Sequence, residues 1–437
     1  MITGDLDRAL ATAIGSAGTW RPAPPGTARG VRTYVTTIAF WLARGHAGGP
    51  GAPAPAAAAA GLAARLSGLD WVEAVAVTGG GYLAATVTAD ALARLAVRIT
   101  EAGPGCARSS ALAGTSLAAP VATDLASAPA WEEARRRVHA TVTGRLAEAA
   151  GAHLRWEHDA KRITAPHPAA PVTAGPGVAG VADGPALAVS PVVESPLEGR
   201  AAEGRAVEGR AAGGPAAESP AAEGPAAEGR AAGSPAMGSP AAESPAAEGP
   251  ALAVGPVAAA VAYAGADAIT YALARQLPRG PARVDARLAA AHHLGNPAYA
   301  VQYAHAHAAS ALRQAADLGL GRGEAAEFQP RLLAHPGEQA LLSTLSWLPE
   351  RVAGAARRAR PDALAHFLEG LARAYFDCQE TCPAVRPGMV VPDGTDRSPA
   401  GRAAVQAAAA RLWLAAAART ALGAGLGLLG VGAPDRL

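Results

Sequence analysis

Lysine is almost absent from this sequence of 437 residues. Lys161 is the one lysine, so arginine supplies the remaining 37 of the 38 basic side chains. A functional site that needs a lysine at any other position is therefore excluded. The bias toward Ala, Arg, Gly and Pro is typical of a GC-rich genome and says little about function.

Aromatic residues and cysteines are also scarce. Aromatics make up 4% of the chain although half of it counts as hydrophobic, so the apolar fraction is mostly alanine, which buries little area per residue. Three cysteines cannot form a disulfide framework. Cys378 and Cys382 are close in sequence but lack a second pair of ligands for zinc. We expect no metal and no other cofactor.

The charge balance and the termini exclude further classes of protein. A net charge of +2 does not suit a basic tail that coats nucleic acid. The first residues include Asp5, Asp7 and Arg8 and do not form a signal peptide. Arg411 and Arg419 interrupt the most apolar stretch, so we expect no membrane span. The sequence predicts a cytoplasmic protein with no membrane partner.

A five-residue repeat divides the chain. Residues 201–250 repeat units such as AAEGR, AAESP and AAEGP. These units offer almost nothing to bury, so ordering them would cost more entropy than burial returns. We predict a disordered low-complexity linker over 166–256, with docking of a partner as the alternative.

The residues before the linker predict an α+β N-terminal domain over 1–103. Alternating residues predict strands at 71–77 and 82–87, with Gly79–Gly81 as the turn between them. Periodic apolar residues predict helices at 5–14, 31–44, 60–66 and 90–101. Residues 104–165 form a helical transition segment, in which 131–162 predicts an amphipathic helix or helical pair with an arginine-rich side.

The residues after the linker predict an all-α helical bundle over 257–437. Asn296 and Pro297 are a strong start signal, because Asn caps a helix and Pro suits its first position. We expect the helix to run over 298–317, and further helices over 338–360, 362–378 and 401–422, the last ended by Gly423.

The C-terminal half carries motifs that resemble a known family. Residues 296–307 read NPAYAVQYAHAH and resemble the N-P-x-Y-x-V-Q-Y-A-H-A-R motif of arginyl-tRNA synthetases. Residues 265–275 (GADAITYALAR) and 428–437 (LLGVGAPDRL) are similar to that family's G-x-D-A-x-R-Y-x-L segment and L-L-G-V-x-A-P-E-R-M terminus. The resemblance implies a DALR anticodon-binding domain over 257–437.

The N-terminal domain is similar to the same family at fewer positions. Residues 32–43 (RTYVTTIAFWLA) are similar to its G-D-Y-A-T-N-x-A-x-x-L-A helix, and 81–83 (GYL) to its G-F-[IL]-N segment. In the family this domain contacts the elbow of tRNA, and the resemblance implies the same role here.

The sequence departs from the family where the catalytic domain is expected. None of the eleven histidines stands in an H-x-G-H signature, and no lysine follows Lys161, so the family's lysine-bearing loop is missing. Those residues bind ATP and stabilise charge during adenylate formation. Residues 104–256 also hold too few large apolar residues for a parallel sheet buried on both faces.

The resemblance implies a set of RNA-binding residues. On the first long helix they are Tyr299, Gln302, Tyr303, His305 and His307, and toward the end of the chain they are Arg411, Arg419 and Leu437. Rings spaced by four residues share a helix face and can stack on splayed bases. Packing of Tyr299 and Tyr303 inside the bundle is the alternative, as is a solvated face for the two arginines.

Two of these positions differ from the family. His307 stands where the family has arginine, which weakens a phosphate contact at neutral pH. Leu437 stands where the family has methionine, which puts base recognition at the terminus in doubt.

The sequence thus favours a non-catalytic paralogue of arginyl-tRNA synthetase that binds tRNA, with tRNA-Arg as the first candidate. An arginine–tRNA ligase, acting alone or with a partner chain, is one alternative. The other is a protein-interaction module that has lost RNA binding and contacts a synthetase or a biosynthetic enzyme.

Overall fold

The computed structural model describes residues 2–14, 20–22, 30–43, 54–119, 124–156, 255–385 and 398–437. Met1–Pro166 and Leu252–Leu437 form one compact unit, and His167–Ala251 form a second, whose residues lie outside the described ranges. The predicted linker over 166–256 lies almost wholly outside the described residues and stays a prediction.

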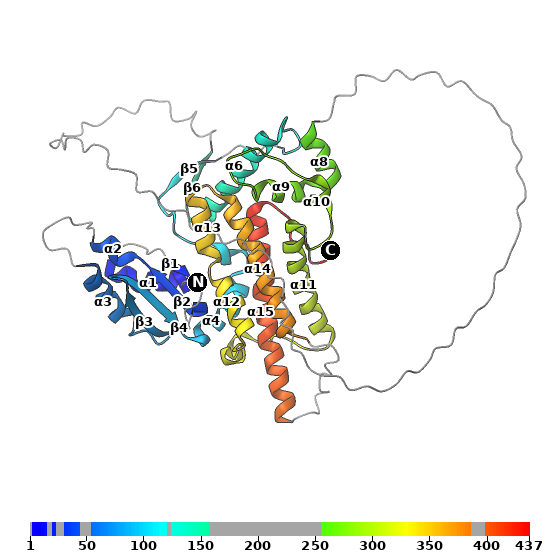
Figure 1. Ribbon diagram of the computed structural model, residues 1–437. Helices are drawn as coiled ribbons and strands as arrows, with labels where there is room; N and C mark the ends of the chain where they lie inside the picture. The colour runs from blue at the N-terminus through cyan, green and yellow to red at the C-terminus, as the bar shows by residue number, and fades with distance from the viewer. Residues whose placement is uncertain are drawn as a thin grey trace, which may run out of the picture. The chain divides into compact units, whose positions relative to one another are not determined.

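The N-terminal part is a small sheet with helices, as the sequence predicted. The sheet has the order β1-β2-β4-β3, and its neighbours pair antiparallel (Figure 1). The strands are β1 (Trp20–Pro22), β2 (Thr33–Thr36), β3 (Val72–Thr78) and β4 (Tyr82–Val87). The helices are α1 (Ile2–Ile14), α2 (Ile38–Ala43), α3 (Pro55–Leu66), α4 (Ala89–Ala93) and α5 (Leu95–Ala102), with short 3-10 turns η1 (Gly30–Arg32) and η2 (Gly103–Ala107).

The predicted hairpin is confirmed, and the helix predicted over 31–44 is confirmed only at Ile38–Ala43. Three glycines with positive φ turn the chain between β3 and β4. Residues 33–36, which we placed in a helix over 31–44, form strand β2 and pair with β4. Tyr34 and Thr36 are buried while their neighbours are half-buried, so this segment has the two-residue period of a strand.

The described residues of the middle part include one helix and a parallel pair of short strands. Helix α6 (Trp131–Ala149) ends earlier than predicted, and β6 (His153–Trp156) follows it and pairs with β5 (Ser116–Ala119). Arg135 and His139 of α6 are buried: Arg135 donates to the carbonyl of Gly280, and Nε2 of His139 lies 3.0 Å from the carbonyl of Leu273. Part of the predicted basic side of this helix therefore faces the protein.

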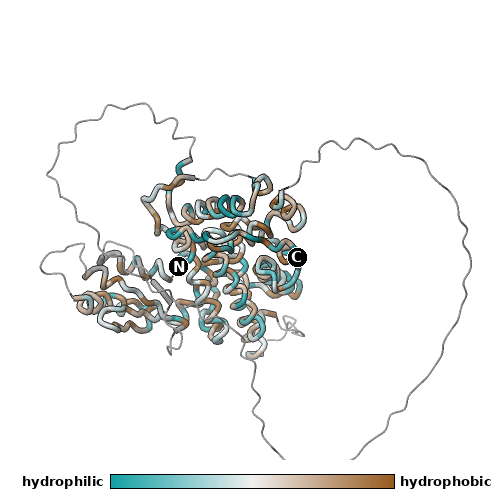
Figure 2. Tube along the Cα trace, turned by 45° about the horizontal axis from the view of Figure 1, so that its top comes forward, coloured by the Kyte–Doolittle hydropathy of each residue, from teal (hydrophilic) through white to brown (hydrophobic). Residues whose placement is uncertain are grey.

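The C-terminal part is a helical bundle. Its helices are α8 (Pro256–Ala264), α9 (Ala266–Ala274), α10 (Ala286–Ala290), α11 (Pro297–Asp317), α12 (Pro336–Ser346), α13 (Leu348–Arg357), α14 (Pro361–Thr381) and α15 (Pro399–Leu429), with 3-10 turns η3 (Ala325–Glu327) and η4 (Pro330–Leu332). Helix α15 packs against α11 and α14 (Figure 1), and also against α5. Hydrophobic positions recur along these helices (Figure 2).

Two helix boundaries differ from the predictions. The single helix expected over 338–360 is two helices, α12 and α13, that meet at Trp347. Pro349 lies in the first turn of α13, where the missing backbone N–H costs nothing. Helix α15 continues through Gly423 to Leu429 and ends at Gly430, whose φ of 79° is left-handed.

The sheet and the bundle pack together within one compact unit. The hydroxyl of Tyr34 in β2 donates to Oγ of Ser346 in α12 at 2.8 Å, and the Tyr34 ring lies 5.0 Å from the ring of Trp347. Tyr34 and Ser346 are both buried. The domain boundaries predicted at residues 103, 165 and 256 stay predictions. The residues on both sides of 103 belong to the same compact unit.

Helix α15 is long and apolar enough to cross a membrane. In the protein, 72% of its apolar window is buried against other elements. The helix therefore serves as the core of the bundle.

Candidate nucleic-acid interface

Helix α11 begins at a cap that also fixes the preceding loop. Oδ1 of Asn296 accepts from the backbone N–H of Ala298 at 3.1 Å. Its side-chain nitrogen donates to the carbonyls of Ala289 and Ala291 at 2.9 and 2.8 Å. Asn296 is buried, so all these bonds are shielded from water. The cap therefore sets the position of the 291–295 loop relative to the first turn of α11.

Five rings form a continuous row along α11, which we call the aromatic ladder. Its members are His292, Tyr299, Tyr303, His307 and Phe376. The His292 and Tyr299 rings are 5.5 Å apart, the Tyr299 and Tyr303 rings 5.7 Å, and the Tyr303 and Phe376 rings 5.7 Å, all stacked. His307 contacts both Tyr303 and Phe376 edge-on. Offset and edge-on contacts of this kind favour a rigid row.

The ladder lies at the surface but rests on buried side chains. His292 is exposed, and the other four members are half-buried. Beneath His307, the buried Tyr375 places its hydroxyl 2.9 Å from Nδ1 of the imidazole. Burial lowers the pKa of His307, so its ring is neutral at pH 7. His307 thus offers a neutral ring face for stacking on a base and no cation for a phosphate.

The last residues of the chain are tied to the bundle beside the ladder. We call residues 430–437 the C-terminal segment. The backbone N–H of Gly432 donates to Asp267 at 2.7 Å, and the Gln302 amide donates to the Gly432 carbonyl at 2.9 Å. His305 lies with Nδ1 3.0 Å from the Pro434 carbonyl. Arg313 donates to the Asp435 carbonyl at 3.1 Å.

Arg419 holds the same segment through its charge. Its guanidinium donates to both carboxylate oxygens of Asp435 at 2.8 to 2.9 Å, and this pairing lowers the pKa of Asp435. His305 is 5% exposed, and burial lowers its pKa. Gln302, His305 and Arg419, which the sequence predicted to contact RNA, therefore each have a partner in the C-terminal segment. Contact of RNA with the His305 ring would require this segment to move away.

The end of the chain reaches the ladder. An open hollow of about 290 Å³ is bordered by His292, Tyr299, Gln302 and Leu437. Leu437 is 59% exposed. The terminal residue therefore stands next to the first two rings of the ladder, as a contact to a stacked base would require.

Arg411 lies away from this surface. Its Nε donates to Oε1 of Glu338 at 2.8 Å, and Glu338 is 1% exposed. The other carboxylate oxygen of Glu338 accepts from the backbone N–H of His335 and caps α12. Arg411 thus neutralises a buried carboxylate inside the bundle. This partner argues against the predicted phosphate contact.

The sequence named three members of the ladder, Tyr299, Tyr303 and His307, and missed the other two. Tyr299 and Tyr303 were visible from their spacing on one helix. His292 precedes the helix, and Phe376 comes from α14, so no local spacing connects them with the tyrosines. Among the described residues, no three His, Cys, Asp or Glu side chains come together as metal ligands.

The comparisons with known proteins concern this region. Residues 301–437 match the DALR anticodon binding domain family. The match begins inside α11 and includes Tyr303, α14, α15 and the C-terminal segment.

Curated relatives match part of the chain. The chain is 39% identical over 177 residues to an arginine–tRNA ligase of Micrococcus luteus, which covers 40% of this chain and 30% of that protein. It is 38% identical over 174 residues to an arginine–tRNA ligase of Frankia alni, covering 40% and 29%. The matched part thus spans less than a third of the length of these relatives. The chain is homologous to arginyl-tRNA synthetases over that part.

A solved structure extends the likeness of the fold. The arginyl-tRNA synthetase of Thermus thermophilus superposes with a TM-score of 0.50 and 14% sequence identity, covering 100% of this chain and 99% of that one. At this identity the likeness concerns the fold alone.

Proposed function

We propose that this protein is a non-catalytic paralogue of arginyl-tRNA synthetase that binds tRNA through its DALR region. The observation that carries the proposal is the aromatic ladder on the helix where the family match begins. Stacked rings beside an exposed chain end suit unpaired bases of an RNA loop. The N-terminal sheet is proposed to contact a second part of the same tRNA, and the protein to act in the cytoplasm.

The proposed absence of catalysis rests on the sequence. The 437 residues contain no H-x-G-H signature and no lysine after Lys161. Adenylate formation needs fixed positive charge around the ATP phosphates, and these are the residues that supply it in the family.

Binding is tested with the purified chain and total tRNA in a mobility-shift assay at low salt. We expect saturable binding that weakens as salt rises, because phosphate contacts release counterions. Tyr303→Ala should weaken binding by roughly 5- to 100-fold, since a stacked base contributes about 1–3 kcal/mol. Tyr303→Phe keeps the ring and should bind as the parent does.

Tyr263→Ala is the matched control, because Tyr263 is 65% exposed on α8 and lies outside the ladder. It should leave binding unchanged. Absence of binding to any tRNA at low salt would refute the proposal. If Tyr303→Ala binds tRNA as tightly as the parent, the aromatic ladder is not part of the RNA-binding surface.

The alternative of a ligase is decided by arginine-dependent exchange between ATP and pyrophosphate. Exchange by the purified chain would contradict the non-catalytic assignment. Recovery of a synthetase or biosynthetic enzyme together with the chain, without RNA, would favour the protein-interaction module.

A further inference from the structure

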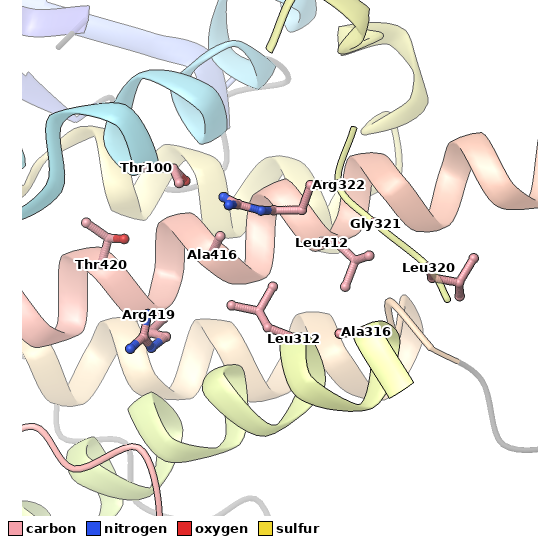
Figure 3. A pocket seen from close by; sticks show the side chains of 10 residues that line it. All are labelled: Thr100, Leu312, Ala316, Leu320, Gly321, Arg322, Leu412, Ala416, Arg419 and Thr420. Carbon is pink, nitrogen blue, oxygen red and sulfur yellow. The ribbon is translucent and has the colours of Figure 1, made fainter. Parts of the chain in front are cut away.

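Two hollows meet at the loop that follows α11. The first, of about 370 Å³, lies where α5, α11 and α15 approach one another (Figure 3). The second, of about 520 Å³, lies between α15 and the residues around η3 and η4. Gly321 and Arg322 border both hollows, so the two are neighbours. None of the five ladder residues borders either hollow.

Arg322 is held at the junction with its charge available. Its guanidinium carbon lies 4.6 Å from the centroid of the Trp413 ring. The indole N–H of Trp413 donates to the Arg322 carbonyl at 2.9 Å, which fixes the backbone as well. In the part of the chain that the structure describes, no carboxylate pairs with Arg322. In Figure 3 its side chain extends toward Thr100.

The first hollow suits an anion. Besides Arg322 it is bordered by Arg419, Thr100 and Thr420, and no Asp or Glu is among its bordering residues. Arg419 is already neutralised by Asp435, and the Thr100 hydroxyl donates to the Ala96 carbonyl. Arg322 and the Thr420 hydroxyl are therefore the groups left to donate to a phosphate.

The second hollow differs from the first because it has a carboxylate as well as Arg322 at its border. It is bordered by the carboxylate of Glu327, the amides of Gln329 and Gln406, and the rings of Phe328 and Trp413. The Phe328 ring meets the Trp413 ring edge-on at 6.4 Å. A carboxylate repels phosphate and accepts from an amino group, and ring and amide side chains suit a planar heterocycle.

We propose that the two hollows form a nucleotide-binding site separate from the aromatic ladder. The phosphate lies on Arg322 and Thr420, and the base lies in the second hollow with its exocyclic amino group on Glu327. The asymmetry of charge gives the ligand one orientation. The ligand is a nucleotide whose base carries an amino group, either free or as a unit of RNA.

The site is tested by calorimetric titration of the full chain with four probes: CMP, cytidine, UMP and inorganic phosphate. CMP should bind saturably. Cytidine lacks the phosphate and UMP lacks the amino group, so each should bind about tenfold or more weakly, the scale of a lost hydrogen bond to a charged group. Equal binding of CMP, cytidine and UMP, or no binding of CMP, would overturn the proposal.

Variants locate the two ends of the ligand. Arg322→Ala should abolish CMP binding, whereas Arg136→Ala, which removes an exposed arginine of α6 with the same change in net charge, should not. Glu327→Gln should reduce the preference for CMP over UMP, because an amide can also donate to the uracil carbonyl. Glu327 is exposed, so this variant decides the question if Arg322→Ala fails to fold. Unchanged preference in Glu327→Gln would overturn the assignment of the base.

A further pair of measurements identifies the source of the nucleotide. Competition by a short unstructured RNA for bound CMP assigns the site to RNA, and absence of competition assigns it to free nucleotide. Tyr303→Ala should bind CMP as the parent does. CMP binding therefore tests this site even if the protein binds no tRNA.

Discussion

Arg411 and Arg419 lie on the same helix, and their partners give them different roles. Arg411 pairs with Glu338, which is almost fully buried, whereas Arg419 pairs with the exposed carboxylate of Asp435. Removing one member of a buried pair leaves an uncompensated charge in a medium that solvates it poorly. The same change at the surface leaves a hydrated carboxylate.

We therefore expect Arg411→Ala to lower the free energy of unfolding by about 3 kcal/mol. Arg419→Ala should lower it by about 1 kcal/mol or less. Urea unfolding of the two variants measures the difference. A stable Arg411→Ala variant with weakened RNA binding would instead support the phosphate contact that the sequence suggested.

At the same scale, the sequence revealed the ladder only in part. The spacing of Tyr299 and Tyr303 places their rings on one face, and the structure stacks them 5.7 Å apart. Gln302 and His305 occupy the same helix but bond to the C-terminal segment. A contact with residues more than a hundred positions away leaves no trace in the local pattern, so these two roles could not be separated from the sequence.

Elements with a strong local signal were predicted well. Helix α11 begins at the expected cap, and β3 and β4 flank the expected glycine turn. The errors have tertiary causes. Strand β2 is short, and pairing with β4 decides its conformation over the helical pattern of its neighbours. Helices α12 and α13 share one apolar pattern, but Pro349 cannot continue the first helix.

The sequence predicted that Gly423 ends the last helix, whereas α15 continues to Leu429 through two further glycines at 425 and 427. A Cβ on Gly425 would meet Cδ2 of Leu368 at 2.3 Å, so this glycine permits close approach of α15 to α14. A Cβ on Gly427 would meet nothing within 4 Å. Glycine has low helix propensity, but at position 425 its lack of a side chain allows α15 to pack closely against α14.

These two glycines form a matched pair for mutation. Gly427→Ala should raise the free energy of unfolding by roughly 0.5–1 kcal/mol, because alanine loses less backbone entropy in a helix. Gly425→Ala should lower it by about 1–3 kcal/mol, because the added methyl group displaces Leu368. Thermal and urea unfolding give both signs. Stabilisation by both changes would show that α14 and α15 are not in close contact at this point.

At the scale of the whole molecule, three histidines, two buried and one half-buried, join parts of the compact unit. His139 links α6 to α9, His305 links α11 to the C-terminal segment, and His307 links α11 to Tyr375 of α14. Burial lowers the pKa of all three, because the charged imidazolium is poorly solvated there. The fold thus holds these rings neutral at each of three contacts.

The lowered pKa values predict how stability depends on pH. In the unfolded chain a histidine titrates near pH 6.5, above its value in the folded protein. Between those values the unfolded chain binds more protons, so the free energy of unfolding falls as the pH falls through about 6.5. Asp5 and Asp435 have lowered pKa values as well, but their contribution is lost only near pH 4 and below. In the range from about pH 7.5 to 5.5 we therefore expect the histidines to dominate. Burial raises the pKa of Glu350, whose protonation in the folded protein acts in the opposite direction.

Urea unfolding across that range measures the effect. The midpoint should fall steadily toward the acid side, and His307→Gln should flatten the decline, because glutamine cannot take up a proton. His153→Gln is the control: His153 is exposed in β6, where its ring is hydrated in the folded and the unfolded chain alike. A midpoint that rises toward pH 5.5 would show that the imidazoles gain protons on folding. The contacts of α6, α11 and the C-terminal segment would then have to accommodate charged rings, and the ladder would carry a cation at His307.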